Sequence, residues 1–202
     1  MDNVFIAGAG TGVGKTVAAA VLTTRLEGDY WKPIQCGEEK KSDTEQMRSW
    51  IDTRKNTIHQ PAYSLQACLS PHHAARLEEC TIDSKSLQLP ATDRPLIIEG
   101  VGGLFVPLTL SFLTFDLFKQ WKGRWIVVSR HYLGSINHTL LTIEALKLHG
   151  QEILGLIFNG DPNQDSEDAI LSISKIPMIG RLFPEPIIDS ATIQRYAKEW
   201  IL

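Results

Sequence analysis

One short stretch decides the fold of this chain: Gly8-Ala9-Gly10-Thr11-Gly12-Val13-Gly14-Lys15-Thr16. An apolar run of strand length, residues 3–7, precedes it, and residues 15–26 follow with apolar side chains near helical spacing. Glycines between a strand and a helix let backbone N–H groups turn inward on phosphate oxygens, and the helix N-terminus adds partial positive charge. Lys15 can reach the β- and γ-phosphates of a nucleotide, and the Thr16 hydroxyl can hold Mg²⁺. The stretch therefore predicts a loop that binds the phosphates of ATP together with Mg²⁺.

This loop departs by one position from the common GxxxxGK[ST] pattern, because Ala9 occupies the site of its first glycine. Gly8 stands one residue earlier and gives the GxxxxxGKT spacing of a variant loop. The alternative interpretation is a flexible glycine turn with an incidental lysine. The strand before it, the helix after it and the intact Gly-Lys-Thr at 14–16 favour a phosphate-binding P-loop.

The rest of the chain alternates between apolar runs of strand length and helical patterns, which indicates βαβ units and a parallel sheet. We expect strands at 3–7, 30–34, 96–99, 125–129, 153–158 and 178–182. We expect helices at 15–26, 43–51, 71–79, 136–149, 166–174 and 189–200. These elements predict a single α/β domain over residues 1–202, with the three-layer P-loop NTPase fold and a mostly parallel central sheet flanked by helices. Ligands of such sheets collect at the carboxyl ends of the strands.

Composition narrows the classes of partner. The net charge of −3 gives no reason to expect attraction to nucleic acid or to an anionic membrane. Asp2 stands where a signal peptide would carry positive charge, and no apolar run approaches the ~18 residues of a membrane helix. Cys36, Cys68 and Cys80 include no CxxC pair, which suggests free thiols in a reducing compartment. We therefore expect a cytoplasmic protein with neither nucleic acid nor membrane as a partner.

Three charged side chains fall at predicted strand ends or a helix start near the phosphate loop. Lys32 beside a phosphate site could neutralise charge on a transferred phosphoryl group, although alone it also suits a surface lysine. Asp43, after Ser42, opens a helix, where such residues are commonly N-caps. Glu99 closes the Leu-Ile-Ile strand; a carboxylate there suits a Mg²⁺ ligand, and a loop or capping carboxylate is the alternative.

A fourth segment begins the helix predicted at 136–149. It comprises Gly134, Ser135, Ile136 and Asn137, and its backbone N–H groups could grip an anion. An ordinary capped helix start is the alternative interpretation, and this segment alone does not separate the two.

Together these segments resemble the dethiobiotin synthetase family over nearly the whole chain. The matching strings, in the family's order and approximate spacing, are the variant loop, Lys-Pro-Ile-Gln-Cys-Gly at 32–37, Ser-Asp at 42–43, Ser-Pro-His at 70–72, Glu-Gly-Val-Gly-Gly at 99–103, Val-Pro-Leu at 106–108, Leu-Gly-Ser-Ile-Asn-His at 133–138 and Asn-Gly at 159–160. The family joins CO₂ to 7,8-diaminopelargonic acid and closes a cyclic urea, converting ATP to ADP and phosphate. The resemblance thus implies an ATP- and Mg²⁺-dependent cyclo-ligase (dethiobiotin synthase) of biotin biosynthesis.

The resemblance also implies a role for each matching residue. Lys32 would be the catalytic residue, stabilising the carbamate and the phosphoryl group that it attacks, and Thr16, Asp43 and Glu99 would surround the metal. The nucleotide would contact Gly12, Val13, Gly14, Lys15, Thr16, Val17, Asp43, Glu99, Gly100, Val101, Gly102, Asn159, Gly160, Pro184 and Glu185. In this set Asn159 matches the residue that reads adenine, and the backbone near Pro184 and Glu185 matches the other adenine contact.

For the substrate, the resemblance implies contacts from Thr11 and Cys36 and from Gly134, Ser135, Ile136 and Asn137. The last four match the segment that binds the substrate carboxylate across the interface of a homodimer. Three features depart from the family: Ala9 and Gly10 replace a usual Thr-Asp pair, Cys36 replaces a serine or threonine, and the stretch between Asn159 and Gly180 is short.

The main alternative is a regulatory P-loop ATPase of the chromosome-partition or septum-placement type, which uses the same fold. Those proteins typically carry a second lysine early in the loop, where this chain has glycine or alanine. Residues 189–202 also lack the pattern of a basic amphipathic tail. An amidotransferase-type synthetase would need a glutaminase domain, for which no chain remains.

Overall fold

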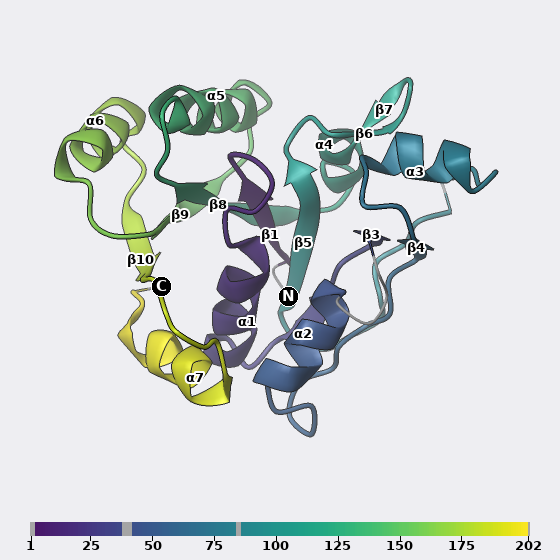
Figure 1. Cartoon of the computed structure of the whole chain (residues 1–202), viewed down its shortest axis with the longest axis horizontal. Coiled ribbons are helices and arrows are strands. Elements are labelled where there is room, and N and C mark those ends of the chain that lie inside the picture. The colour runs from purple at the N-terminus through teal and green to yellow at the C-terminus, as the bar shows by residue number, and fades with distance from the viewer. Residues whose placement is uncertain (1–2, 38–41, 84–85, 202) are drawn as a thin grey trace.

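The computed structural model describes residues 3–37, 42–83 and 86–201, and its centre is a six-stranded sheet in the order β10-β9-β8-β1-β5-β2. Every pair of neighbouring strands in it is parallel. The strands are β1 (Asn3–Gly8), β2 (Asp29–Trp31), β5 (Leu96–Gly103), β8 (Gly123–Arg130), β9 (Ile153–Asn159) and β10 (Met178–Leu182). Figure 1 shows β1 near the middle of the sheet, with the phosphate loop at its carboxyl end.

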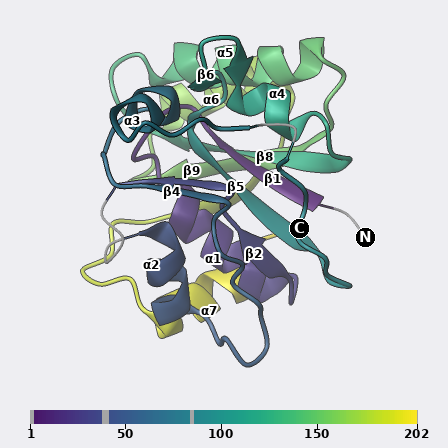
Figure 2. The ribbon, with the colours of Figure 1, turned by 90° about the vertical axis from the view of Figure 1, so that its right-hand side faces the viewer.

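Helices cover both faces of this sheet, as Figure 2 shows edge-on. One face carries α1 (Lys15–Arg25), α2 (Asp43–Trp50) and α7 (Ser190–Glu199), and the other carries α4 (Thr114–Phe118), α5 (Ser135–Leu148) and α6 (Gln164–Ser174). Two hydrophobic clusters fill the two interfaces: Ile6 belongs to the cluster with Leu22 and Ile193, and its neighbour Phe5 to the cluster with Ile143. Successive strand residues therefore face opposite layers, and both faces are buried, as in other wound parallel sheets. The three-layer α/β fold is confirmed.

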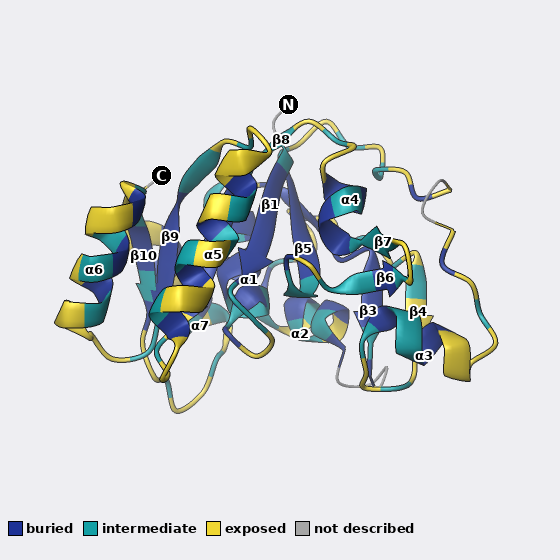
Figure 3. Ribbon diagram, turned by 90° about the horizontal axis from the view of Figure 1, so that it is seen from above, coloured by how far each residue is buried: buried dark blue, intermediate teal, exposed yellow. Residues whose placement is uncertain are grey.

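The outer surfaces of the helices are exposed to solvent. Figure 3 shows this for α5 and α6, whose inner faces are buried against the sheet. Among the described residues, no helix is both long and apolar enough to cross a membrane.

The strand predicted at 30–34 is wrong, because the chain forms two strands that lie in different sheets. After β2 ends at Trp31, β3 (Ile34–Cys36) pairs in parallel with β4 (Tyr63–Leu65), and α3 (Pro71–Leu77) packs against both. Pro33 lies at the break, since it has no N–H to give to a strand ladder. Its carbonyl instead accepts hydrogen bonds from the backbones of Ala62 and Tyr63.

A second correction concerns Glu99, which was expected at the end of its strand. Strand β5 runs on to Gly103, where it still pairs with Gly8 of β1, so Glu99 lies within the strand and faces Ile6 in the register. The glycines after it suggest a loop in the sequence, and here they form an irregular part of the strand: the register shifts between Ile6 and Gly8, and Gly102 has a φ of 64°. A small hairpin of β6 (Pro107–Thr109) and β7 (Phe112–Leu113) follows. The other predicted strands and the predicted helices are present, with ends shifted by about two residues at most.

Candidate functional site

The phosphate loop connects β1 to α1, and its glycines are required by its backbone geometry. Gly12 and Gly14 have φ of 69° and 98°, in the left-handed region that side chains disfavour. A Cβ on Gly8 would lie 2.8 Å from the carbonyl oxygen of Gly10 and 2.9 Å from Lys15 Nζ. Lys15 is 6% exposed, and its ammonium donates to the Gly10 carbonyl at 2.9 Å. The loop therefore holds its lysine inward, over the space that the glycines enclose.

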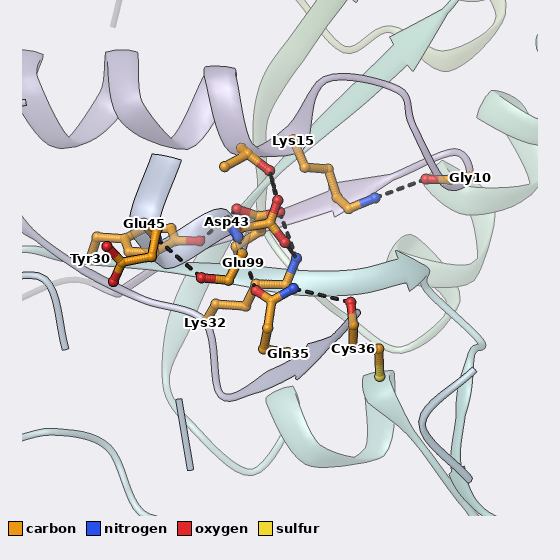
Figure 4. A network of polar contacts seen from close by, with 11 residues as sticks. Gly10, Lys15, Tyr30, Lys32, Gln35, Cys36, Asp43, Glu45 and Glu99 are labelled. Atoms are coloured by element: carbon orange, nitrogen blue, oxygen red, sulfur yellow. Dashed lines mark hydrogen bonds and ion pairs between the residues drawn. The ribbon is translucent and has the colours of Figure 1, made fainter. Parts of the chain in front are cut away.

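A compact cluster of charged groups lies beside the loop, built from β2, β5, the start of α1 and the start of α2 (Figure 4). The Thr16 hydroxyl lies 2.7 Å from Asp43 Oδ1 and 2.9 Å from Glu99 Oε1. Lys32 Nζ forms ion pairs with Asp43 Oδ2 and, at 3.1 Å, with Glu99 Oε1. From the other side, the buried Tyr30 hydroxyl donates to Glu99 Oε2 at 2.8 Å. The cluster brings together Lys32, predicted as the catalytic residue, and Thr16, Asp43 and Glu99, predicted as metal ligands.

Local folding explains how Asp43 reaches this cluster. Ser42 caps α2 by accepting a hydrogen bond from the Glu45 N–H at 3.3 Å, which leaves Asp43 free for the site. The backbone N–H of Asp43 in turn donates to Gln35 Oε1 at 3.1 Å, so β3 also anchors the start of α2. The capping role that the sequence allowed for either residue thus belongs to Ser42.

Burial and neighbouring charges set the protonation of the site. Burial alone would raise the pKa of the Asp43 carboxyl, but the Lys32 ammonium and hydrogen bonds from Lys32 and Thr16 hold that pKa below its ordinary value. Burial alone would lower the pKa of Lys32, but Glu99 and Asp43 raise it above its ordinary value. Burial raises the pKa of Tyr30, as does the Glu99 carboxylate beside it. At neutral pH the cluster therefore contains a charged lysine, an ionised Asp43 and a neutral tyrosine.

The oxygens of Thr16, Asp43 and Glu99 suit Mg²⁺, which prefers hard oxygen ligands and commonly takes one or two carboxylates together with nucleotide phosphates and water. Among the described residues, no three His, Cys, Asp or Glu side chains lie together as a metal site made by the protein alone. Two carboxylates and a hydroxyl beside a phosphate loop therefore fit a metal that the nucleotide helps to hold.

A cavity of about 540 Å³ opens from the phosphate loop across this cluster to β3. It brings together these predicted site residues: Thr11, Gly12, Gly14, Lys15, Thr16, Val17, Lys32, Cys36, Asp43, Glu99, Val101 and Gly102. It is also lined by residues for which the sequence predicted no role, including Gln46, Trp50, Cys68, Leu69 and Val106. Burial raises the pKa of the Cys36 thiol to about 11, so Cys36 faces this cavity as a neutral thiol at neutral pH.

Tyr30 and Gln35 are further members of the site that the sequence analysis missed. Tyr30 reads as an ordinary core aromatic, and Gln35 as a polar residue after a strand. The only signal for Tyr30 is its position two residues before Lys32, since side chains two apart in extended backbone share a face.

Other predicted nucleotide residues lie outside the cavity lining. Val13, in the loop itself, and Gly100, in β5, are both buried. Asn159 ends β9, and its side-chain N–H donates to the Val13 carbonyl at 2.9 Å, while Gly160 is paired with Leu182 through its backbone N–H at 2.8 Å. Asn159 is therefore held against the phosphate loop by its bond to Val13.

Pro184 and Glu185 follow β10. The Glu185 carboxylate is engaged by the Tyr196 hydroxyl and the Arg195 guanidinium, so its side chain belongs to a local cluster with α7. This leaves the backbone of Pro184 and Glu185 as the element that the resemblance assigns to adenine.

The segment Gly134 to Asn137 begins α5 and does not line the cavity of its own chain. Gly134 has φ of 101°, and no side chain caps the helix. Ser135 is buried and Ile136 half-buried, whereas Gly134 and Asn137 are exposed and the adjoining Leu133 is fully exposed. The structure therefore does not bring these four residues to the phosphate loop within one chain.

The pKa of Lys15 predicts a pH dependence for nucleotide binding. Burial, with the Lys32 charge, lowers that pKa to about 8, while Glu99 and Asp43 oppose the change. Bound phosphate favours the charged ammonium, so above about pH 8 binding must be accompanied by proton uptake. Relative to Lys15→Met, the affinity for ADP without divalent metal is expected to be constant below that pH and to fall by up to ~10-fold per pH unit above it. Calorimetric titration at a series of pH values measures this slope. Lys15→Met is the control and should show none of it; equal slopes for both proteins would contradict the prediction.

The parallel sheet, the glycine-rich loop with Lys15 and Thr16, and the carboxylates beside it define a P-loop NTPase. A family model described as an AAA domain matches residues 2–192. The chain is 41% identical to the ATP-dependent dethiobiotin synthetase BioD of Christiangramia forsetii, over 97% of this chain and 94% of that one. It is also 41% identical to the same enzyme of Chlamydia abortus, over 98% of this chain and 94% of that one. The chain belongs to the ATP-dependent dethiobiotin synthetase family.

Similar solved structures agree on the fold. A ParA family ATPase from Chlorobium tepidum has a TM-score of 0.57 at 14% identity, covering 98% of this chain and all of that one. The septum site-determining protein MinD of Pyrococcus horikoshii has a TM-score of 0.55 at 16% identity, covering 98% of this chain and 89% of that one. At such low identity these likenesses support the P-loop fold alone.

Proposed function

We propose that this protein joins CO₂ to 7,8-diaminopelargonic acid and closes the ring to give dethiobiotin, converting ATP to ADP and phosphate. The proposal is carried by one observation: in a chain of this family, the phosphate loop, Lys32, Asp43, Glu99 and Cys36 line the same cavity. The reaction belongs to biotin biosynthesis, and we propose that it takes place in the cytoplasm, where ATP is supplied.

The chemistry needs no nucleophilic side chain. One substrate nitrogen captures CO₂ to give a carbamate, an oxygen of the carbamate attacks the γ-phosphorus of ATP, and ADP leaves. The second nitrogen then attacks the carbamate carbon and expels phosphate, which closes the cyclic urea. The protein contributes position and charge compensation, which is the usual division of labour in phosphoryl transfer.

Lys15 and Lys32 carry most of the positive charge in this scheme. Lys15, in the loop, would contact the β- and γ-phosphates. Lys32 would stabilise the carbamate and the phosphoryl group. The pKa of Lys32, raised by Glu99 and Asp43 against the effect of burial, supports this role because it keeps the ammonium charged at the pH of the reaction. We assign the nucleotide base to Asn159 and the backbone of Pro184 and Glu185.

We also propose that Thr16, Asp43 and Glu99 hold Mg²⁺ with the nucleotide; the metal would neutralise charge on the phosphates. Asp43→Asn and Glu99→Gln are expected to weaken Mn²⁺ binding in the ADP complex by ~10-fold or more, because each removes a charged oxygen ligand. Electron paramagnetic resonance of free Mn²⁺ measures this. Asp52→Asn, on an aspartate paired with the exposed Arg54, is the matched control. Metal affinity unchanged in both site variants would contradict the assignment.

The reaction itself is tested by omission of each substrate. ADP release should require both diaminopelargonate and bicarbonate, and dethiobiotin should form in equal amount to ADP. ADP release that continues at the same rate with either compound omitted would contradict the proposed function and favour a nucleotide switch.

A further inference from the structure

A buried ion pair lies behind the corner of the sheet to which we assign the nucleotide base. Arg181, on β10, forms an ion pair through Nη2 with Glu167 Oε2 on α6, and both side chains are at most 10% exposed. The other terminal nitrogen of Arg181, Nη1, donates to the carbonyl oxygen of Gly160 at 3.2 Å. One guanidinium therefore joins three elements, α6, β10 and the end of β9.

The Glu167 carboxylate also has several partners. Besides Arg181, its carboxylate accepts a hydrogen bond from the Asn163 N–H at 3.0 Å and lies 2.8 Å from Nε2 of His131. Burial would raise the pKa of Glu167, but these hydrogen bonds and the Arg181 charge hold it below its ordinary value. Glu167 is thus an ionised, nearly fully paired carboxylate that fixes the position of the guanidinium.

The atoms that Arg181 contacts lie next to Asn159. Gly160 follows it in the chain, and Arg181 bonds the Gly160 carbonyl while the Gly160 N–H bonds the Leu182 carbonyl at 2.8 Å. Asn159 itself bonds Val13 at 2.9 Å, and a Cβ on Gly14 would lie 2.5 Å from its Nδ2. The guanidinium also lies over the rings of Phe158 and Phe183, 6.0 and 5.8 Å from their centroids. These contacts fix both ends of the corner formed by residues 158–160 and 181–183.

We propose that Arg181, held by Glu167, is a positioning residue for nucleotide binding that sets the orientation of the Asn159–Gly160 corner against the phosphate loop. The inference rests on the proposed function, which assigns the nucleotide base to that corner. The proposal also gives a physical role to the short stretch between Asn159 and Gly180. Through Arg181, the buried pair joins the start of this stretch, at Gly160, to β10, which follows it. A pair that only attached α6 to the sheet would have no need of the bond to Gly160.

The test compares a ligand that has a base with one that does not. Replacing Arg181 alone would leave Glu167 buried without its main partner, so the working variant is the double substitution Glu167→Gln/Arg181→Met, which removes both charges at similar volume. Its dissociation constant for ADP is expected to rise ~10-fold, the scale of one or two lost hydrogen bonds to the base. Its dissociation constant for inorganic tripolyphosphate, which occupies the loop without a base, should stay within about twofold of wild type by the same reasoning. Both are measured by calorimetry.

Two further variants sharpen the result. Arg181→Lys keeps the charge but loses the planar guanidinium, whose two terminal nitrogens bond Glu167 and the Gly160 carbonyl separately. It should therefore weaken ADP binding by an intermediate amount without affecting tripolyphosphate. His131→Asn removes a different partner of Glu167 and leaves the bond to Gly160, so its affinity for ADP should match wild type. A parallel loss for both ligands, or no loss for either, would overturn the proposal. The readout needs no diaminopelargonate: a wild-type protein that binds ADP but makes no dethiobiotin would contradict the proposed function and leave this test intact.

Discussion

Lys15→Ala is expected to reduce the rate of dethiobiotin formation by at least ~10³-fold, or about 4 kcal/mol, the scale for a charged group acting in the transition state. The ammonium of Lys15 is buried above the loop glycines and bonded to the Gly10 carbonyl, so it is directed at the space in which we expect the phosphates. Coupled measurement of ADP release gives the rate, with dethiobiotin quantified separately.

The loss should not come from unfolding. Burial lowers the pKa of Lys15, which means that its charge is held in the folded protein at some cost, and its removal should leave the melting temperature nearly unchanged. Lys119→Ala is the matched control, since Lys119 is an exposed lysine whose ion pair with Asp116 lies on α4. A folded Lys15→Ala protein that keeps most of its activity would rule out this role for the lysine.

The phosphate loop is predictable from the sequence because its determinants are local. Gly12 and Gly14 provide the left-handed turns, and Lys15 and Thr16 follow directly, so a few consecutive residues encode the whole geometry. At Glu99 the local sequence is a poorer guide, because the glycines that follow it suggest that the strand ends there. Pairing between β5 and β1 nevertheless resumes at Gly103, after an irregular stretch in which Gly102 has a φ of 64°.

The charged cluster is predictable only in part. Asp43 and Glu99 each have an ordinary interpretation when they are considered alone, and the resemblance to the family brought them together with Lys32. Tyr30 and Gln35 carry no comparable signal, because their roles depend on contacts across elements that are distant in the sequence. Short elements such as β4, α4 and the β6–β7 hairpin were missed because they are too brief for a periodic pattern and depend on tertiary packing.

The buried pair of Glu167 and Arg181 illustrates the same limit. In the sequence, Glu167 occupies the first turn of a helix, where an acidic residue is expected on the surface. Its burial goes with the packing of α6 against α5 and with its bonds to Arg181 and His131, which no local pattern encodes.

The largest expected gain of activity concerns the assembly of the site. We propose a two-fold dimer in which the Gly134 to Asn137 segment of one chain binds the substrate carboxylate at the phosphate loop of the other. This segment begins α5 without a side-chain cap, lies outside the cavity of its own chain, and is flanked by the exposed Leu133 and Leu141. Backbone N–H groups at a helix start favour an anion, and two-fold dimers are the commonest closed assembly. Dilution below the dimer dissociation constant should therefore weaken substrate binding and leave ADP binding nearly intact.

Mixing two inactive variants gives the sharper test. Lys15→Ala disables the phosphate loop, and Asn137→Glu places a carboxylate where the substrate carboxylate should bind. In a heterodimer with shared sites, both defects fall on one site, because the Lys15→Ala loop is completed by the Asn137→Glu segment. The other site is then intact. Random exchange of equal amounts makes half of the dimers heterodimers, so activity should recover to about a quarter of the wild-type value per chain.

The converse mixture separates shared sites from independent ones. A chain that carries both Lys15→Ala and Asn137→Glu should inactivate a wild-type partner, because each site of the heterodimer then contains one defect. Equal amounts should leave about a quarter of wild-type activity per chain if sites are shared, and about half if each chain builds its own site. Subunit exchange is verified first by native mass spectrometry of chains that differ in mass. If exchange is complete and two inactive chains restore nothing, while the doubly changed chain leaves its partner fully active, the substrate site is not shared between subunits.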